Sequence, residues 1–203
     1  MRLYTSPSTP FGRKVAVVIH EAGLLEQVEW VKVAGNAVDP GTMPLESNPL
    51  GKIPVLIAND GRVLYDSRVI CRYLADLALP SLYPTGPRLW DTLTLEAAAD
   101  GVMDAGILMV YEGRVRPEEL RYAPWVEGQW AKITRTLDMI EANCVAQLAE
   151  PLDAAQIALG CMAGHLDLRH GARNWRDGHP QLAEWEAGFA LRPAMQATKP
   201  LAQ

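Results

Sequence analysis

The stretch Asn48-Pro49-Leu50-Gly51-Lys52-Ile53-Pro54-Val55-Leu56, with Leu64-Tyr65-Asp66-Ser67 shortly after it, decides how the first part of the chain folds. An apolar strand begins directly after Pro54, a residue without an amide hydrogen to donate. A cis Ile53-Pro54 bond would expose the Ile53 backbone for pairing with an extended peptide ligand, whereas an ordinary trans proline would only open the strand. In the second stretch a strand ends, and Ser67 is the expected N-cap of a helix.

Outward from this centre, residues 1–79 alternate short apolar runs with helical patterns. The sequence predicts strands at Leu3-Tyr4, Val28–Val33, Val55–Ile57 and Val63-Leu64. A helix is expected to begin at Thr9-Pro10, because threonine is a good N-cap and proline suits the first helical position. The pattern is typical of an α/β domain.

Beyond Pro87 the periodicity is helical throughout. We expect helices at 89–110, 125–148, 153–168 and 180–191, the third opened by an Asp153–Gln156 capping box. Residues 80–87 hold three prolines and a glycine, a composition that disfavours both helix and strand. The sequence therefore predicts domains at 1–79 and 88–203, joined by a linker at 80–87.

Composition excludes several classes of function. The chain has 203 residues and a formal net charge of −5, without a basic run of the kind that binds nucleic acid. No stretch is apolar and long enough to span a membrane, and no signal-like segment opens the chain. The three cysteines lie far apart in apolar sequence, which favours reduced, packed thiols. A cytoplasmic protein is expected.

Two helix starts carry the candidate chemistry. The start at Thr9 offers free amides, partial positive charge and a hydroxyl, which together favour a thiolate; the alternative is that Thr9 only caps the helix. At the second start, Ser67 and the first amides suit a ligand carboxylate, and Asp66 suits an ammonium group. Asp-Ser is also ordinary capping chemistry.

The order and spacing of these elements resemble the glutathione transferase family, in particular small bacterial members whose substrates are poorly defined. The resemblance covers nearly the whole chain, including the blocks at 48–56 and 64–67, the helix at 153–159 and the ending at 192–198. It implies an N-terminal thioredoxin-like domain, βαβαββα, followed by an all-helical domain.

The resemblance also implies roles for single residues. Thr9 would lie beside the glutathione sulfur, and Ile53, before a cis proline, would pair with the cysteinyl backbone. Lys52 would lie along the peptide. Asp66 and Ser67 would hold the amino and carboxylate groups of the γ-glutamyl end.

Asp104 is the last residue that the resemblance points to. It would reach the glutamyl group bound by the neighbouring subunit of a symmetric homodimer. Asp100 lies four residues earlier on the same helix face, and two like charges at this spacing are more often solvated or paired with arginine.

The expected activity is nucleophilic. Thiol-dependent members of the family have a cysteine where this chain has Thr9, so a mixed disulfide cannot form there. Instead the glutathione thiolate would attack a small electrophile, a disulfide or a peroxide. Tyr4, Ser6 and Ser8 are alternative donors to the thiolate. The alternative function is a glutathione-binding or protein-interaction module without turnover.

We expect no metal site. Of the four histidines, His165 and His170 are the closest pair, and five residues on a helix would turn their side chains about 140° apart.

Overall fold

The computed structural model describes residues 1–200. Its first part contains four strands and two helices, in an order that confirms the predicted strands. The strands are β1 (Arg2–Thr5), β2 (Glu29–Lys32), β3 (Val55–Ile57) and β4 (Val63–Leu64), and the helices are α1 (Pro10–Glu21) and α2 (Ser67–Ala78).

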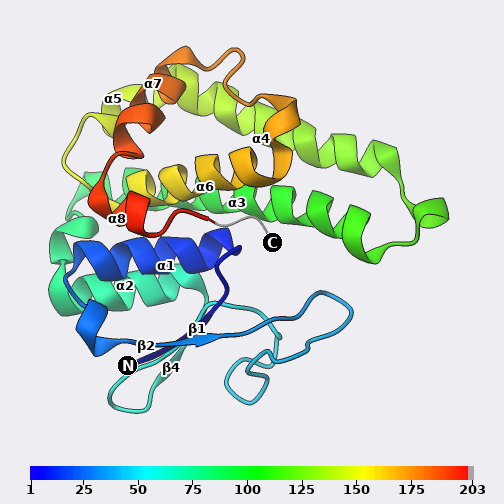
Figure 1. Ribbon diagram of the computed structural model, residues 1–203. Helices are drawn as coiled ribbons and strands as arrows, with labels where there is room; N and C mark the ends of the chain where they lie inside the picture. Colours follow the sequence, from blue (N-terminus) through cyan, green and yellow to red (C-terminus); the bar gives the residue numbers. More distant parts are fainter. Residues whose placement is uncertain (201–203) are drawn as a thin grey trace.

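The strands form one mixed sheet in the order β2-β1-β3-β4. β1 runs parallel to β2 and antiparallel to β3, and β3 runs antiparallel to β4. Helices α1 and α2 cover one face of this sheet (Figure 1), and Leu3 and Leu56 are fully buried in the core that they share. The thioredoxin-like arrangement is therefore confirmed.

The rest of the chain is helical, as predicted. It contains α3 (Pro87–Val115), α4 (Ala123–Asn143), α5 (Val145–Leu148), α6 (Ala154–His170), α7 (Pro180–Phe189) and α8 (Pro193–Ala197). In Figure 1, α3 and α6 form a layer directly over α1 and α2, and α4 and α7 lie beyond them. No helix within residues 1–200 is both long and apolar enough to cross a membrane.

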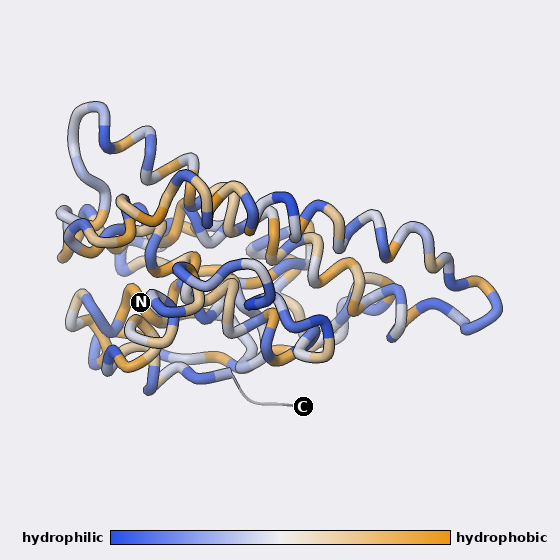
Figure 2. The backbone as a smooth tube through the Cα atoms, turned by 90° about the horizontal axis from the view of Figure 1, so that it is seen from above, coloured by the Kyte–Doolittle hydropathy of each residue, from blue (hydrophilic) through white to orange (hydrophobic). Residues whose placement is uncertain are grey.

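Helix α6 lies at the centre of the helical part. Asp153 accepts a hydrogen bond from the Gln156 amide (3.0 Å), and the Gln156 side chain accepts one from the Asp153 amide (3.4 Å), so the predicted capping box is present. Most of the helix is buried. By contrast, the connection between α3 and α4 projects furthest from the core and is largely hydrophilic (Figure 2).

One predicted element is missing. The order βαβαββα requires a helix between β2 and β3, but residues 33–54 form turns and loops. Seven residues that oppose a continuous helix explain this, because glycine favours other backbone conformations and proline lacks the amide that a helix interior needs. They are Gly35, Pro40, Gly41, Pro44, Pro49, Gly51 and Pro54.

Further boundaries differ from the expectation. The helix expected at 89–110 is longer at both ends, and it begins with Pro87 of the expected linker. The helix expected at 125–148 is interrupted at Cys144. Just before it, the side-chain amide of Asn143 donates a hydrogen bond to the Met139 carbonyl (3.1 Å) and so competes with the backbone hydrogen bonds of the helix. In the segment 80–87, Pro80 opens a short 3₁₀ turn that ends at Leu82, and Leu82 and Tyr83 are buried. The division into two domains at this segment stays a prediction.

Candidate functional site

Three loops meet at one edge of the sheet, and the strand register brings them together. Tyr4 at the end of β1 pairs with Val55 at the beginning of β3, and Leu56 pairs with Leu64 at the end of β4. The chain leaving β1, the chain entering β3 and the chain leaving β4 therefore share this edge. These are the segments 6–9, 48–54 and 65–67, which contain all but one of the predicted site residues.

Helix α1 begins at this edge as predicted, with Thr9 at the N-cap and Pro10 in the first turn. The Thr9 amide donates to the Ser6 carbonyl (3.2 Å), but its side chain makes no capping bond. A Cβ at Gly12 would collide with the side chains of Thr5 and Thr9, so the tight packing of this start requires glycine. The Thr9 hydroxyl is thus not used to cap the helix. The Ser6 and Ser8 hydroxyl oxygens lie 3.4 Å apart beside it.

The loop before β3 is held by Asn48, which is buried. Its amide group donates to the Lys52 carbonyl (2.8 Å), and its side-chain oxygen accepts from the Leu50 amide (3.1 Å). Gly51 has φ of +62°, which favours glycine and completes the turn. These contacts fix the approach of the chain to the Ile53-Pro54 bond, which is cis, as the resemblance implied.

This geometry leaves the Ile53 backbone available. Within residues 1–200, neither its N–H nor its C=O takes part in a hydrogen bond. A peptide ligand lying along the edge could therefore pair with both groups as an added strand would. The neighbouring Lys52 is exposed, with its side chain near Asp104 of α3.

The start of α2 differs from the prediction, because Asp66 and not Ser67 is the N-cap. Asp66 has an extended backbone, and its carboxylate accepts from the Arg68 amide (3.0 Å) and the Arg68 guanidinium (2.8 Å). A carboxylate is an equally good capping acceptor and lies one residue earlier, so it takes the position. Partial burial would raise the pKa of Asp66, but the Arg68 hydrogen bonds bring it below its ordinary value.

Ser67 consequently belongs to the first helical turn. It is 2% exposed, and within residues 1–200 its hydroxyl makes no hydrogen bond. Asp66 and Ser67 both lie at the edge of the sheet, as predicted. Only the capping residue differs, because Asp66 caps α2 in place of Ser67.

A buried ion cluster behind the edge was not predicted. The Lys14 ammonium group is 1% exposed and donates to the carboxylates of Glu96 (3.0 Å) and Asp100 (2.8 Å). Burial lowers the pKa of Lys14, but the surrounding negative charges raise it above its ordinary value, so the group stays charged. Asp100 also lies 3.7 Å from the Arg68 guanidinium. Both helix starts are thereby tied to α3.

The sequence held a signal for this cluster. Lys14 stands among the apolar residues of α1, and Glu96 and Asp100 lie four apart in an otherwise apolar part of α3. A buried charge of one sign needs one of the other. Asp100, expected to be solvated or paired with arginine, is buried, and it contacts Lys14 more closely than Arg68.

Asp104 lies one turn further along α3 and is exposed. Burial of its carboxyl group raises its pKa, and the positive charges of Lys52 and Arg68, with a smaller effect, oppose this change. The expected role of Asp104 toward the neighbouring subunit stays a prediction.

The two histidines of α6 are closer than predicted. The rings of His165 and His170 lie 5.9 Å apart edge to face, because His170 ends the helix with a φ of −131° and both side chains reach the backbone at Gly106. The 140° estimate was wrong here because it ignored the helix end. Within residues 1–200, no three potential metal ligands gather into a site.

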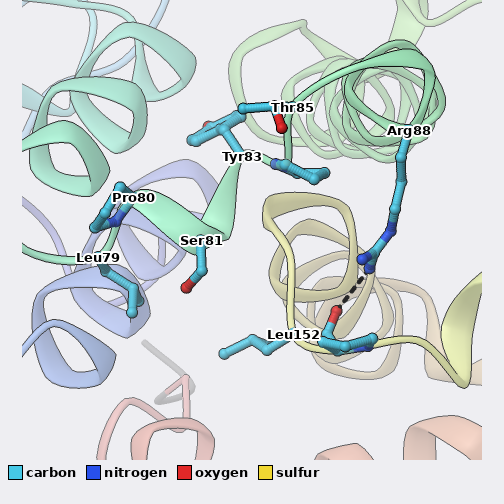
Figure 3. Close-up of a pocket in the computed structure, with 9 residues that line it drawn as sticks. Leu79, Pro80, Ser81, Tyr83, Thr85, Arg88 and Leu152 are labelled. Carbon is cyan, nitrogen blue, oxygen red and sulfur yellow. Dashed lines mark hydrogen bonds between the residues drawn. The ribbon is translucent and has the colours of Figure 1, made fainter.

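A cavity of about 560 Å³ lies elsewhere, between the end of α2, the start of α3 and the segment before α6 (Figure 3). The Arg88 guanidinium crosses it to the Pro151 carbonyl (2.9 Å). A helix of the length of α2 spans about 18 Å, so this cavity is separated from Asp66 by the whole helix. None of the predicted site residues lines it.

Comparisons with known proteins agree with this geometry. The family "Glutathione S-transferase, N-terminal domain" matches residues 9–77, and "Glutathione S-transferase, C-terminal domain" matches residues 123–188. The chain is 31% identical to the uncharacterized GST-like protein YibF of Escherichia coli K12, with 98% of each chain covered.

Two solved structures are similar over the full length. One is a glutathione transferase family member from Pseudomonas fluorescens Pf-5 with bound glutathione, 43% identical over 98% of each chain, with a TM-score of 0.96. The other, from the same organism, has bound S-(propanoic acid)-glutathione and is 42% identical over 99% of this chain and 100% of that one, with a TM-score of 0.90.

Proposed function

Because this chain belongs to the glutathione transferase family, we propose that it binds glutathione at the edge of its sheet and activates the thiol for attack on a small electrophile. The observation that carries the proposal is the strand register. It brings a free peptide edge at Ile53 and two helix starts to the same edge of the sheet.

The sulfur end lies at the start of α1. The backbone of Ile53 pairs with the cysteinyl residue of glutathione, which directs the sulfur toward Thr9. A thiolate at this point is stabilised by the free amides of the first turn and by a hydrogen bond from the Thr9 hydroxyl. The Thr9 side chain makes no capping hydrogen bond within residues 1–200, which supports this role, because the hydroxyl can bind the thiolate without breaking a capping bond.

The γ-glutamyl end lies at the start of α2. Asp66 accepts from the ammonium group, and the Ser67 hydroxyl with the first amides of α2 donates to the carboxylate. Asp66 already accepts from Arg68, but a carboxylate has about four acceptor positions, so it can bind both cations. Lys52 lies along the peptide, and Asp104 reaches the glutamyl group bound by the neighbouring subunit of the homodimer.

Bound ligands in the two solved structures from Pseudomonas fluorescens support the same ligand here. One contains glutathione, and the other contains S-(propanoic acid)-glutathione. The second compound is a conjugate of the kind that a transferase produces.

The active form is a homodimer in the cytoplasm. Large apolar side chains remain more than a third exposed around β4 and α2, namely Val63, Tyr65 and Val69, as an interface between two copies requires. The three cysteines are free thiols, as is usual in a reducing compartment.

The test follows the thiolate of bound glutathione by its ultraviolet absorbance across pH. In the wild type we expect a thiol pKa about two units below the free value near 8.5. Thr9→Ala returns the pKa toward the free value and lowers kcat with a generic aryl halide about tenfold, with little change in affinity, because a hydrogen bond to an anion contributes about 1.5–3 kcal/mol.

Tyr4→Phe, Ser6→Ala and Ser8→Ala are the matched controls. If one of them raises the thiol pKa and Thr9→Ala does not, that hydroxyl takes the role given to Thr9. A wild-type protein that binds glutathione but turns over no aryl halide, peroxide or mixed disulfide is the non-catalytic binding module instead. A protein that does not bind millimolar glutathione contradicts the proposal as a whole.

A further inference from the structure

Asn48 is a buried asparagine, 2% exposed, and each of its polar atoms is hydrogen-bonded within its own loop. Its backbone N–H donates to the Pro44 carbonyl (2.8 Å), and its carbonyl accepts from the Gly51 amide (3.0 Å). Its side-chain oxygen accepts from the Leu50 amide (3.1 Å), and its side-chain nitrogen donates to the Lys52 carbonyl (2.8 Å). The side chain therefore ties the two ends of the turn together.

The hydrogen bond to Lys52 acts on the peptide group that the ligand would use. The Lys52 carbonyl and the Ile53 N–H belong to one peptide group, and the bond between the two residues is trans. In a planar trans peptide the C=O and the N–H point in opposite directions. Asn48 therefore holds this group from one side, while the Ile53 N–H, unpaired within residues 1–200, points to the other.

Orientation is the first consequence of this contact. Apart from the Asn48 bond, the backbone of Lys52 and Ile53 makes no hydrogen bond within residues 1–200. A peptide group without any such contact can rotate, and rotation would turn the Ile53 N–H away from the ligand. Asn48 removes this freedom before the ligand arrives, which lowers the entropy that binding costs.

Polarisation is the second consequence. Hydrogen bonds that share a peptide group strengthen one another, because a donor at the carbonyl oxygen draws electron density from the nitrogen. The Asn48 amide therefore makes the Ile53 N–H a better donor. The low exposure of Asn48 keeps water from competing for the Lys52 carbonyl on this side.

We propose that Asn48 is a positioning residue for glutathione. Its side-chain amide fixes the Lys52–Ile53 peptide group so that the Ile53 N–H donates to the carbonyl of the cysteinyl residue. This inference rests on the proposed function and names the residue that holds its free peptide edge in place. Asn48 acts through the peptide group and not on the reacting sulfur, so its effect falls on the binding of glutathione.

Asn48→Asp separates the donor from the rest of the side chain. Aspartate has nearly the same shape and still accepts from the Leu50 amide, but its carboxylate cannot donate to the Lys52 carbonyl. We expect the affinity for glutathione, measured by titration calorimetry, to fall about tenfold, because a hydrogen bond is lost and a carbonyl is left unpaired. Asn48→Ala also removes the donor, adds no charge and gives a similar loss.

Asn143→Asp is the matched control. The Asn143 side chain also donates to a backbone carbonyl, that of Met139 (3.1 Å), but it does so at the end of α4 in the helical part of the chain. The same substitution there leaves the affinity for glutathione unchanged.

The kinetics distinguish positioning from a general loss of structure. In Asn48→Asp, KM for glutathione rises by the same factor as the dissociation constant. At saturating glutathione, kcat and the pKa of the bound thiol keep their wild-type values, because Thr9 and the first turn of α1 are unchanged.

A measurement on the wild type does not depend on the folding of a variant. In isotope-labelled protein, saturating glutathione moves the nuclear magnetic resonance signal of the Ile53 amide proton downfield, because this proton gains an acceptor. A side-chain amide proton of Asn48 moves in the same direction without contacting glutathione, because the two hydrogen bonds share one peptide group. The side-chain signals of Asn143 do not move.

The results that overturn the inference leave the proposed function testable. If the wild type binds glutathione but Asn48→Asp binds it equally tightly, or if the Asn48 side-chain signals do not move, the inference fails while glutathione binding stands. A fall in kcat and a raised thiol pKa in Asn48→Asp also overturn it, since the start of α1 is then disturbed. If the wild type does not bind glutathione, the proposed function fails and the inference with it.

Discussion

Helices α1 and α2 begin at the same edge of the sheet, but their first turns are chemically different. The start of α1 has no acidic residue and no side-chain cap, and Arg13 and His165 line a small cavity together with its residues Ser8 and Pro10. The start of α2 is capped by Asp66, which is ion-paired to Arg68. One start is arranged for an anion, and the other for a zwitterion.

The difference teaches how a single edge can orient an asymmetric ligand. Glutathione has a thiol at its middle residue and both an ammonium and a carboxylate group at its glutamyl end. Exchanging the two ends would put the ammonium group against the positive end of α1 and Arg13, which is unfavourable. Both starts are also fixed to α3 through Asp100, which contacts Lys14 of α1 and Arg68 of α2.

The largest expected effect comes from removing this shared anchor. Lys14→Met leaves the buried carboxylates of Glu96 and Asp100 without their cation, and we expect it to lower the free energy of unfolding by about 3–5 kcal/mol. Chemical denaturation measures the loss. Arg62→Met removes an exposed ion pair and should cost less than about 1 kcal/mol. Equal losses in the two variants would mean that the cluster does not anchor the helix starts.

The next effect concerns the α1 side and acid stability. Because burial lowers the pKa of His165 to about 3, the unfolded chain takes up a proton there below the ordinary histidine pKa of about 6.5, while the folded chain does not. Stability therefore falls as pH drops through this window, by about 1.4 kcal/mol per pH unit.

Denaturation of wild type and His165→Leu at pH 7 and pH 5 checks this slope. The variant should lose about 2 kcal/mol less than the wild type between the two conditions. His20→Leu is a histidine control, since His20 is half-buried at the far end of α1. The same pH dependence in wild type and His165→Leu would show that His165 titrates normally.

On the α2 side, Asp66→Asn separates charge from capping. Asparagine caps a helix as well as aspartate, so stability should change by less than about 0.5 kcal/mol. Glutathione affinity should fall roughly tenfold, because the charge-assisted hydrogen bond to the ammonium group is weakened. Calorimetry measures the affinity for glutathione. The control variant is Asp60→Asn, which alters an exposed loop. If Asp66→Asn binds glutathione as tightly as the wild type, Asp66 does not bind the ammonium group.

The smallest effect is expected at Ser67. Ser67→Ala removes one neutral hydroxyl that is buried at the edge, and affinity for glutathione should fall about fivefold with kcat unchanged. Ser81→Ala is the matched control, because Ser81 lines the cavity of about 560 Å³ at the other end of α2. If Ser81→Ala weakens binding and Ser67→Ala does not, the ligand lies in that cavity and not at the sheet edge.

Much of the fold followed from local patterns. The strand after Pro54, the start at Thr9-Pro10 and the capping box at Asp153 were readable because each depends on residues close in sequence. The missing helix between β2 and β3 was a failure of the expected order. The glycines and prolines that oppose this helix stand in the sequence, whereas the helix itself was implied only by the resemblance.

The sequence by itself determined where helices and strands begin, because capping, proline geometry and apolar periodicity act over a few residues. Only the tertiary structure decided which charges meet. Lys14 is 82 residues from Glu96, and His165 is separated from Arg13 by an even longer stretch. Such contacts depend on how α1 packs between the sheet and the helices α3 and α6, and no local pattern specifies the partner of a buried charge.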